Sequence, residues 1–174
     1  AGYWDYGTSF EVMLIAALQS ALGTDAGIAS QESFMRTASF MTYMATPSGK
    51  SYNFADSGSA ISCTSSKYWF ARQLNDASIV AVDELFIKNK KVLNVRLLPT
   101  YMIFGSALDF SKSQLPRSTW VNHGETPVFV YRSGWESSDD TYFAIKGGRA
   151  STGHAHMDAG SFIYEKDGVR WAID

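Results

Sequence analysis

The spacing of apolar residues changes near residue 105, and this change constrains the fold more than any other feature of the chain. Before it the spacing is helical, with apolar residues at three- and four-residue intervals over 10–21. After it come short apolar runs separated by turn residues. Helices followed by strands are typical of α+β folds or of two successive domains. We therefore predict a helical domain over 1–104 and an antiparallel, strand-rich domain over 105–174.

The first helix pattern is the strongest one. Thr8 or Ser9 can cap its start and Gly23 can end it. Apolar residues also occupy its other faces, which predicts a helix buried on most sides. Further helix patterns cover 30–45, 67–74 and 77–86.

Two segments of the helical part are less regular. Residues 92–104 are apolar, but Pro99 excludes a helix that runs through it, so we predict only a short helix there. Residues 47–66 are rich in Ser and Gly and predict a long loop. Loops of this length are usually functional or disordered, and the aromatic residues Tyr52 and Phe54 argue against disorder.

The second part of the chain predicts four strands and one hairpin. Residues 106–127 indicate a polar connector. Asp167 and Gly168 lie between two apolar runs, and an Asp-Gly pair in that position is a strong hairpin signal. The predicted strands cover 128–131, 141–145, 161–164 and 169–173.

Composition excludes several classes of protein. Charged residues make up 18% of the chain and the net charge is -2, so no basic surface for nucleic acid is expected. The longest apolar run, 12–18, is too short to span a bilayer. The single Cys63 excludes an internal disulfide and an all-cysteine zinc site. The chain has no initiator Met and stops in a strand-like run, so we expect a segment of a longer protein.

Two of the three histidines lie in the run 153–160. If this run is extended, His154, His156 and Asp158 share one face, because side chains alternate along a strand. Two imidazoles and a carboxylate suit zinc, although a solvated edge strand is the alternative. Asp174 follows the hairpin and either approaches His156 across it or begins a turn.

Two further segments invite a functional interpretation. The Gly-rich run 147–153 lacks the lysine of a phosphate-binding loop, and its Arg149 either contacts an acidic ligand or stays solvated. At the amino end, Tyr3, Trp4 and Tyr6 precede the first helix. They line a core, form part of a longer loop, or make an aromatic rim on which sugars stack.

The two unusual segments together resemble the heparinase II/III family of polysaccharide lyases. The resemblance lies in Tyr-Trp-Asp-Tyr-Gly-Thr over 3–8 and in His-Ala-His-Met-Asp-Ala-Gly-Ser-Phe over 154–162, followed by an apolar strand that ends in Asp. The family fold is an (α/α) toroid followed by a layered antiparallel β-sandwich. The resemblance implies that this chain holds the last toroid helices and the first sandwich strands.

The resemblance also implies roles for individual residues. Tyr6 matches the catalytic tyrosine, with Tyr3 as the alternative, and His154 matches the catalytic histidine. His156 and Asp174 match two of three ligands of a structural zinc ion. The third zinc ligand, a histidine, has no match in this chain, nor has the family's upstream Asn or His near the substrate carboxylate. The fragment is therefore expected to be incomplete by itself.

The implied activity is β-elimination on a uronic-acid polysaccharide, such as a heparan sulfate-like or alginate-like polymer, in the periplasm or outside the cell. A base removes the proton at C5 and the oxygen at C4 leaves, while the site must neutralise the neighbouring carboxylate. His154 suits the base because imidazole titrates near neutral pH, and Tyr6 suits the acid. Arg149 or a missing residue neutralises the carboxylate, and Tyr3 and Trp4 contact the sugar.

Two other functional classes compete with the lyase. A non-catalytic carbohydrate-binding module would use Tyr3, Trp4 and Trp135 for stacking on sugars. A zinc hydrolase would use both histidines of the 153–160 run, together with Asp174, as ligands around a reactive water.

Overall fold

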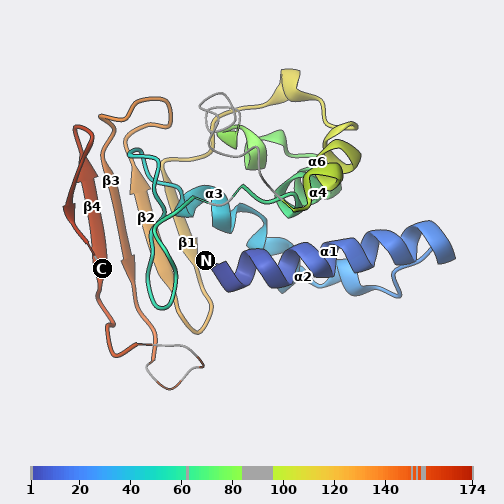
Figure 1. Cartoon of the computed structure of the whole chain (residues 1–174), viewed down its shortest axis with the longest axis horizontal. Helices are drawn as coiled ribbons and strands as arrows, with labels where there is room; N and C mark the ends of the chain where they lie inside the picture. Colours follow the sequence, from blue (N-terminus) through green and yellow to red (C-terminus); the bar gives the residue numbers. More distant parts are fainter. Residues whose placement is uncertain are drawn as a thin grey trace. The chain divides into compact units, whose positions relative to one another are not determined.

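The computed structural model describes residues 2–61, 63–83, 96–149, 151, 153 and 156–173. They form mixed helices and antiparallel strands, an α+β protein, as the change in periodicity predicts (Figure 1). Two compact units interleave along the chain. The helical unit comprises Gly2–Thr42 and Ser62–Leu115, and the sheet unit comprises Tyr43–Ile61 and Pro116–Asp174. The domain boundary predicted at residue 105 stays a prediction.

Helix α1 spans Gly2–Leu22, so the predicted helix is confirmed but begins six residues before Thr8. Thr8 and Ser9 are buried inside the helix and do not cap it. Burial extends the helix, because the Trp4 ring packs against the rings of Phe40 and Phe70 at 5.5 and 6.3 Å. The helix ends as predicted at Gly23, whose φ of 72° suits glycine.

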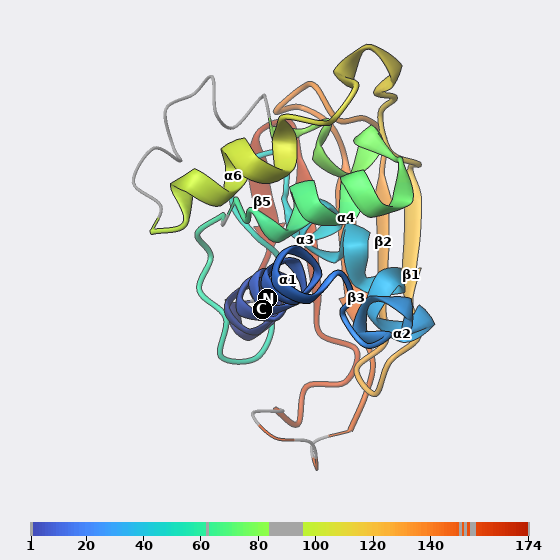
Figure 2. The same ribbon diagram turned by 90° about the vertical axis from the view of Figure 1, so that its right-hand side faces the viewer.

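The burial predicted for α1 is wrong in this structure. In the described part of the chain the buried residues of α1 are Thr8, Ser9, Val12 and Ile15, which lie toward one side of the helix. Phe10 and Leu14 are exposed by 38% and 54%. Helix α4, Ser66–Leu74, packs on the covered side, and Figure 2 shows α1 nearly end-on beside α4. Apolar character all round a helix does not by itself supply neighbours on every face.

The predicted helix over 30–45 is present but interrupted. It consists of α2 (Glu32–Met35), the 3₁₀ turn η2 (Arg36–Ser39) and α3 (Phe40–Met44), after a short 3₁₀ turn η1 (Ile28–Ser30). The other helical elements of the described residues are η3 (Ala77–Val80), α6 (Leu98–Gly105) and η4 (Phe110–Lys112).

Helix α6 is the short helix expected within 92–104. It starts at Leu98 and therefore includes Pro99 in its first turn, where the missing N–H costs no hydrogen bond. The core of the helical unit packs α1, α4, η3 and α6 together. Its buried residues include Val12, Ile15, Trp69, Phe70, Ile79, Val80 and Phe104.

The sheet unit is an antiparallel meander in the order β1-β2-β3-β4-β5. The four predicted strands are confirmed as β2 (Val128–Arg132), β3 (Tyr142–Lys146), β4 (Phe162–Lys166) and β5 (Val169–Ala172). The hairpin is also confirmed, with φ of 54° at Asp167 and 73° at Gly168. The connector predicted over 106–127 is wrong at Thr119–Asn122, which form strand β1. These four residues carry little strand signal of their own and become a strand by pairing with β2.

The two faces of the sheet differ in burial. Val128, Val130 and Ile163 point into the core and are 1% exposed or less. The alternate residues Phe129 and Phe162 are exposed by 37% and 45%, and they flank Ile145 in the cross-strand register. The outer face of the sheet is therefore apolar and open in this chain.

The Ser/Gly-rich loop over 47–61 packs against the core of the sheet unit. Tyr52 is fully buried, and its hydroxyl donates to the carbonyl of Ser161 at 2.9 Å. Isolated bridges join Ala45 to Ser51 and Lys50 to Ala60. Among the described residues, none of the helices has the length and hydropathy needed to cross a membrane.

Candidate functional site

The helical unit contains a cavity of about 190 Å³ beside α1. Among the described residues, three segments line it: the first half of α1, the stretch 63–65, and the stretch 96–101, which runs into α6. Its lining combines aromatic rings, hydroxyl groups and one charge of each sign. The lining residues are Asp5, Tyr6, Ser9, Phe10, Cys63, Thr64, Ser65, Arg96, Leu97 and Tyr101.

Tyr6 is the predicted catalytic residue that lines this cavity. Its side chain is exposed by 65%, and its ring lies 5.0 Å from the ring of Phe10, one helical turn later. Tyr3 is exposed by 68% but does not belong to the described lining residues. Of the two tyrosines that the motif leaves open, Tyr6 is therefore the one beside a cavity.

A chain of hydroxyl groups forms one wall of the cavity. The Thr64 hydroxyl lies 3.0 Å from the Ser9 hydroxyl and 2.9 Å from that of Ser66. The Ser9 hydroxyl also donates to Asp5 Oδ1 at 3.4 Å. These groups orient one another, and two of them, Ser9 and Thr64, line the cavity with hydroxyls that can both donate and accept hydrogen bonds.

The thiol in the cavity wall is unreactive. Burial, followed by the charge of Asp83, raises the pKa of Cys63 to about 12, although Lys67 lowers it. The thiol therefore stays protonated at neutral pH, whereas thiol nucleophiles act as thiolates. Tyr101 donates its hydroxyl hydrogen to the Cys63 carbonyl, and burial raises the pKa of that phenol as well. Burial thus favours the protonated forms of both Cys63 and Tyr101 at neutral pH.

Arg96 supplies the positive charge of the lining. Its guanidinium carbon lies 5.8 Å from the centre of the Phe10 ring, at the limit of a cation–π contact. Arg96 and Tyr6 thus adjoin the same cavity from different segments, 90 positions apart in the sequence. Sequence reasoning missed Arg96, because no spacing signal links the two positions.

A buried ion pair supports the helical unit. Lys67 Nζ donates to Asp83 Oδ1, and the two side chains are only 4% and 2% exposed. Burial raises the pKa of Asp83, while Lys67 and the hydroxyl of Tyr68 oppose that shift. Asp83 Oδ2 has no hydrogen-bond partner among the described residues.

The described part of the predicted histidine cluster, His156 and Asp158, lies in a loop of the sheet unit. The described part of 153–160 forms turns between β3 and β4, so the expected extended face is absent there. His156 Nε2 lies 3.2 Å from Asp56 Oδ1, and both side chains are about half exposed. Asp158 instead accepts from the buried Lys146. His156 and Asp158 therefore have different partners.

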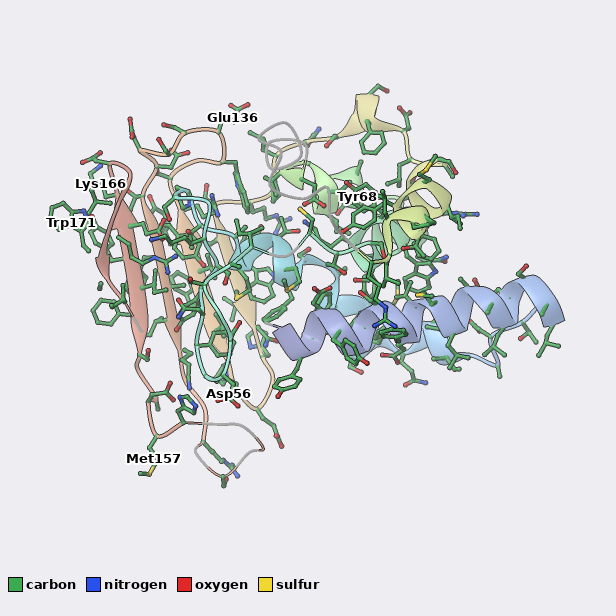
Figure 3. The ribbon with its side chains drawn as sticks, viewed as in Figure 1. Asp56, Tyr68, Glu136, Met157, Lys166 and Trp171 are labelled. Atoms are coloured by element: carbon green, nitrogen blue, oxygen red, sulfur yellow. The ribbon has the colours of Figure 1, made fainter. Side chains whose placement is uncertain are left out.

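The other members of the predicted zinc site fall outside the described residues. His154 and Asp174 are both in that position. The described part of the chain holds no group of three or more metal-ligating side chains. Figure 3 shows Asp56 and Met157 toward the same end of the sheet unit, away from Lys166 and Trp171 at the hairpin. The Asp56 loop thus reaches the histidine-bearing segment.

The remaining predicted sugar contacts occupy varied positions. Trp4 is half-buried in the aromatic cluster of the helical unit, and Arg149 is exposed in the loop after β3. Trp135 is buried, with the Arg132 guanidinium 3.9 Å from its ring centre. Its Nε1–H donates to the Pro116 carbonyl at 2.8 Å. The Trp135 ring is a core element and does not offer a free face to a sugar.

In the sheet unit, a buried ion pair that the sequence analysis missed attaches the loop over 47–61 to the sheet. Arg170 donates to Glu165 Oε1 at 2.5 Å, with the side chains 7% and 2% exposed. Glu165 also accepts from the amide and hydroxyl of Ser48, at 3.1 and 3.0 Å. Arg170 reaches Asn53 Oδ1 at 3.2 Å and the Ser51 carbonyl at 3.1 Å. These bonds fix the long loop to β4 and β5.

Comparison with protein-family models and with curated proteins found no match. The resemblance to heparinase II/III lyases therefore depends on the two sequence motifs, and the cavity beside α1 is the structural feature that bears on it.

Proposed function

We propose that this chain is part of a polysaccharide lyase that cleaves a uronic-acid polysaccharide by β-elimination. The observation that carries the proposal is the position of Tyr6, whose exposed side chain lines a cavity that Arg96 also lines. A lyase needs this combination, because it must protonate a leaving oxygen and stabilise negative charge that develops beside a carboxylate.

The proposed reaction follows from these groups. A base, assigned to His154 by the resemblance, removes the proton from C5 of the uronate. The C5–H electrons form the C4=C5 double bond, and the bond between C4 and its oxygen breaks. Tyr6 acts as the general acid and gives its phenolic proton to the departing oxygen. The products are an unsaturated uronate and a shortened chain with a free hydroxyl.

The finer architecture is part of the same proposal. The helices would be the last ones of an (α/α) toroid, and the meander would be the first layer of a β-sandwich. The exposed apolar residues of the outer sheet face, Phe129 and Phe162, support this assignment, since contiguous exposed apolar surface often marks an interaction site. A structural zinc ion on His156 and Asp174, and a periplasmic or secreted location, complete the proposal.

The test is a panel of uronic-acid polysaccharides treated with the protein that carries this chain. Heparan sulfate, unsulfated glucuronate polymers and alginate are compared, and the ultraviolet absorbance of the unsaturated product is followed. We expect turnover on at least one polymer and a loss of about 100-fold or more in kcat for Tyr6→Phe. Tyr3→Phe tests the alternative tyrosine of the motif and should retain turnover if Tyr6 is the acid. Equal activity of Tyr6→Phe and the unmodified protein would refute the assigned role.

A further inference from the structure

We infer that the cavity beside α1 is a single-sugar subsite in which Arg96 binds the carboxylate of a uronate. The inference rests on the proposed function and adds to it the substrate group that the cavity selects and the residue that selects it. Neither sequence motif contains Arg96, and the sequence suggested Arg149 or a missing residue for this task.

The size of the cavity limits its occupant. Its volume of about 190 Å³ lies below the roughly 300–1,000 Å³ of pockets for drug-sized ligands. One sugar ring is therefore a suitable occupant, whereas a dinucleotide or another extended cofactor is too large. A polymer would place one residue here and continue outward past the exposed Tyr6.

The chemistry of the wall suits a sugar. The rings of Tyr6 and Phe10 offer apolar surface for a pyranose face, and the hydroxyls of Ser9 and Thr64 offer donors and acceptors for sugar hydroxyls. Asp5 is the one acidic residue of the described lining, and it accepts from Ser9 at 3.4 Å. The Asp5 carboxylate can accept hydrogen bonds from sugar hydroxyls, but it repels the carboxylate of a uronate. The uronate carboxylate is therefore expected to lie near Arg96.

Arg96 suits recognition of that acid group. Arginine binds carboxylates with two parallel N–H donors, and this bidentate pairing fixes orientation as well as charge. The guanidinium carbon of Arg96 lies 5.8 Å from the centre of the Phe10 ring. Among the described residues, no acidic side chain forms an ion pair with Arg96. Phe10 is itself a lining residue, so the contact holds the guanidinium at the cavity. A carboxylate bound there would also lose part of its charge, which acidifies the neighbouring C5–H.

The experiment measures binding by the full chain with isothermal titration calorimetry. The probes are a glucuronate-containing tetrasaccharide, a mannuronate trisaccharide, and each oligosaccharide after reduction of its carboxylates to alcohols. The unmodified chain should bind at least one uronate about 10-fold more tightly than its reduced form, as expected for hydrogen bonds to a charged group. Equal affinity for the uronate and reduced forms of both probes would overturn the inference without any substitution.

Three variants identify the residue. Arg96→Gln should lower uronate affinity about 10-fold or more and leave affinity for the reduced probe within about twofold. Arg96→Lys should recover part of the loss, since it keeps the charge without the fork. Arg72→Gln, on the exposed side of α4, is the matched control and should bind normally. An equal loss for both probes in Arg96→Gln would overturn the inference.

The two proposals fail in different ways. If no uronate polymer yields the unsaturated product but uronate binding still depends on Arg96, the lyase assignment fails and the subsite stands. If the protein forms that product and Arg96→Gln leaves both turnover and uronate binding unchanged, the subsite assignment fails and the lyase stands.

Discussion

The charged groups that hold the long loop of the sheet unit differ from the polar groups at the cavity of the helical unit. In the sheet unit Glu165 and Arg132 are buried, the side chain of Arg170 is 7% exposed, and all three are bonded to nearby loop atoms. In the helical unit Tyr6 and Arg96 extend beside an open cavity. A charge whose bonds are all made within the fold contributes to one structure, whereas a charge at a cavity can bind something else. The groups that can bind a ligand therefore lie at the cavity of the helical unit.

The largest expected effect comes from breaking the ion pair of the sheet unit. Glu165→Ala removes the partner of Arg170 and leaves a buried guanidinium without its carboxylate. We expect a loss of about 3–5 kcal/mol in the free energy of unfolding, as for other broken buried pairs. Urea unfolding measures the loss. Hydrogen exchange at the Tyr52 amide, which donates to the Met44 carbonyl at 2.8 Å, should accelerate as the loop loosens.

A small effect of Glu165→Ala would contradict this account of the sheet unit. Glu165→Gln is the companion variant, because it keeps the shape and an acceptor oxygen but loses the charge. It should cost less than the alanine variant. Equal stability of both variants and the unmodified chain would show that these bonds do not hold the loop.

The second prediction concerns the wall of the cavity. Thr64→Val keeps the shape of a 3% exposed side chain but removes the hydroxyl between Ser9 and Ser66. Two buried hydroxyls then lose a partner, and we expect a loss of about 1–3 kcal/mol in unfolding free energy. Thr119→Val is the matched control on an exposed position of β1 and should change stability by less than about 0.5 kcal/mol.

An effect confined to stability would make the cavity wall purely structural. If Thr64 also presents its hydroxyl to a ligand, Thr64→Val lowers sugar affinity measured below the unfolding transition. Unchanged affinity with reduced stability would limit the ligand contacts to Tyr6, Arg96 and their other neighbours.

The elements that the sequence predicts correctly depend on local chemistry. Asp167 and Gly168 adopt the positive φ angles that an Asp-Gly hairpin needs, and Gly23 ends α1, because each requirement lies within a few residues. Strand β1 and the start of α1 were missed, because pairing with β2 and the packing of Trp4 on Phe40 decide them. Such contacts join positions that no local pattern connects.

The candidate site shows the same division more strongly. Tyr6 could be singled out from its motif, but Arg96 could not, since only the packing of α1 against the residues before α6 brings both to one cavity. The extended face predicted for the histidine run was wrong where it is described. Gly160 takes a φ of 92°, and the Ser161 amide donates to the Asp158 carbonyl at 2.9 Å, which makes a turn.

The third prediction uses the buried thiol as a pH probe of the helical unit. Burial raises the pKa of Cys63 from 9.0 to about 12, so the folded chain holds this proton while the unfolded chain releases it. The stability that this proton contributes is complete below pH 9 and is lost as the pH rises from 9 toward 12. Between pH 9 and 10 the loss should be about 1 kcal/mol.

Cys63→Ala should remove this part of the alkaline slope in urea unfolding. Burial also raises the pKa of Tyr68, but tyrosines in the unfolded chain ionise near pH 10, so their effect begins later. A slope between pH 9 and 10 that is the same with and without the thiol would refute the assignment.

The smallest expected effect tests whether burial, and not pairing alone, gives the Glu165–Arg170 pair its importance. Glu32 and Arg36 form an ion pair of the same 2.5 Å length on the surface of α2 and η2, with side chains 78% and 73% exposed. Water and salt screen such a pair, so Glu32→Gln should change the unfolding free energy by only about 0.2–0.5 kcal/mol in urea unfolding at low salt. The change should shrink further at 1 M salt, because the screening length falls to about 3 Å. A loss as large as that of Glu165→Ala would mean that the distance between the two charges decides the energy of the pair. Burial would then not explain the importance of the Glu165–Arg170 pair.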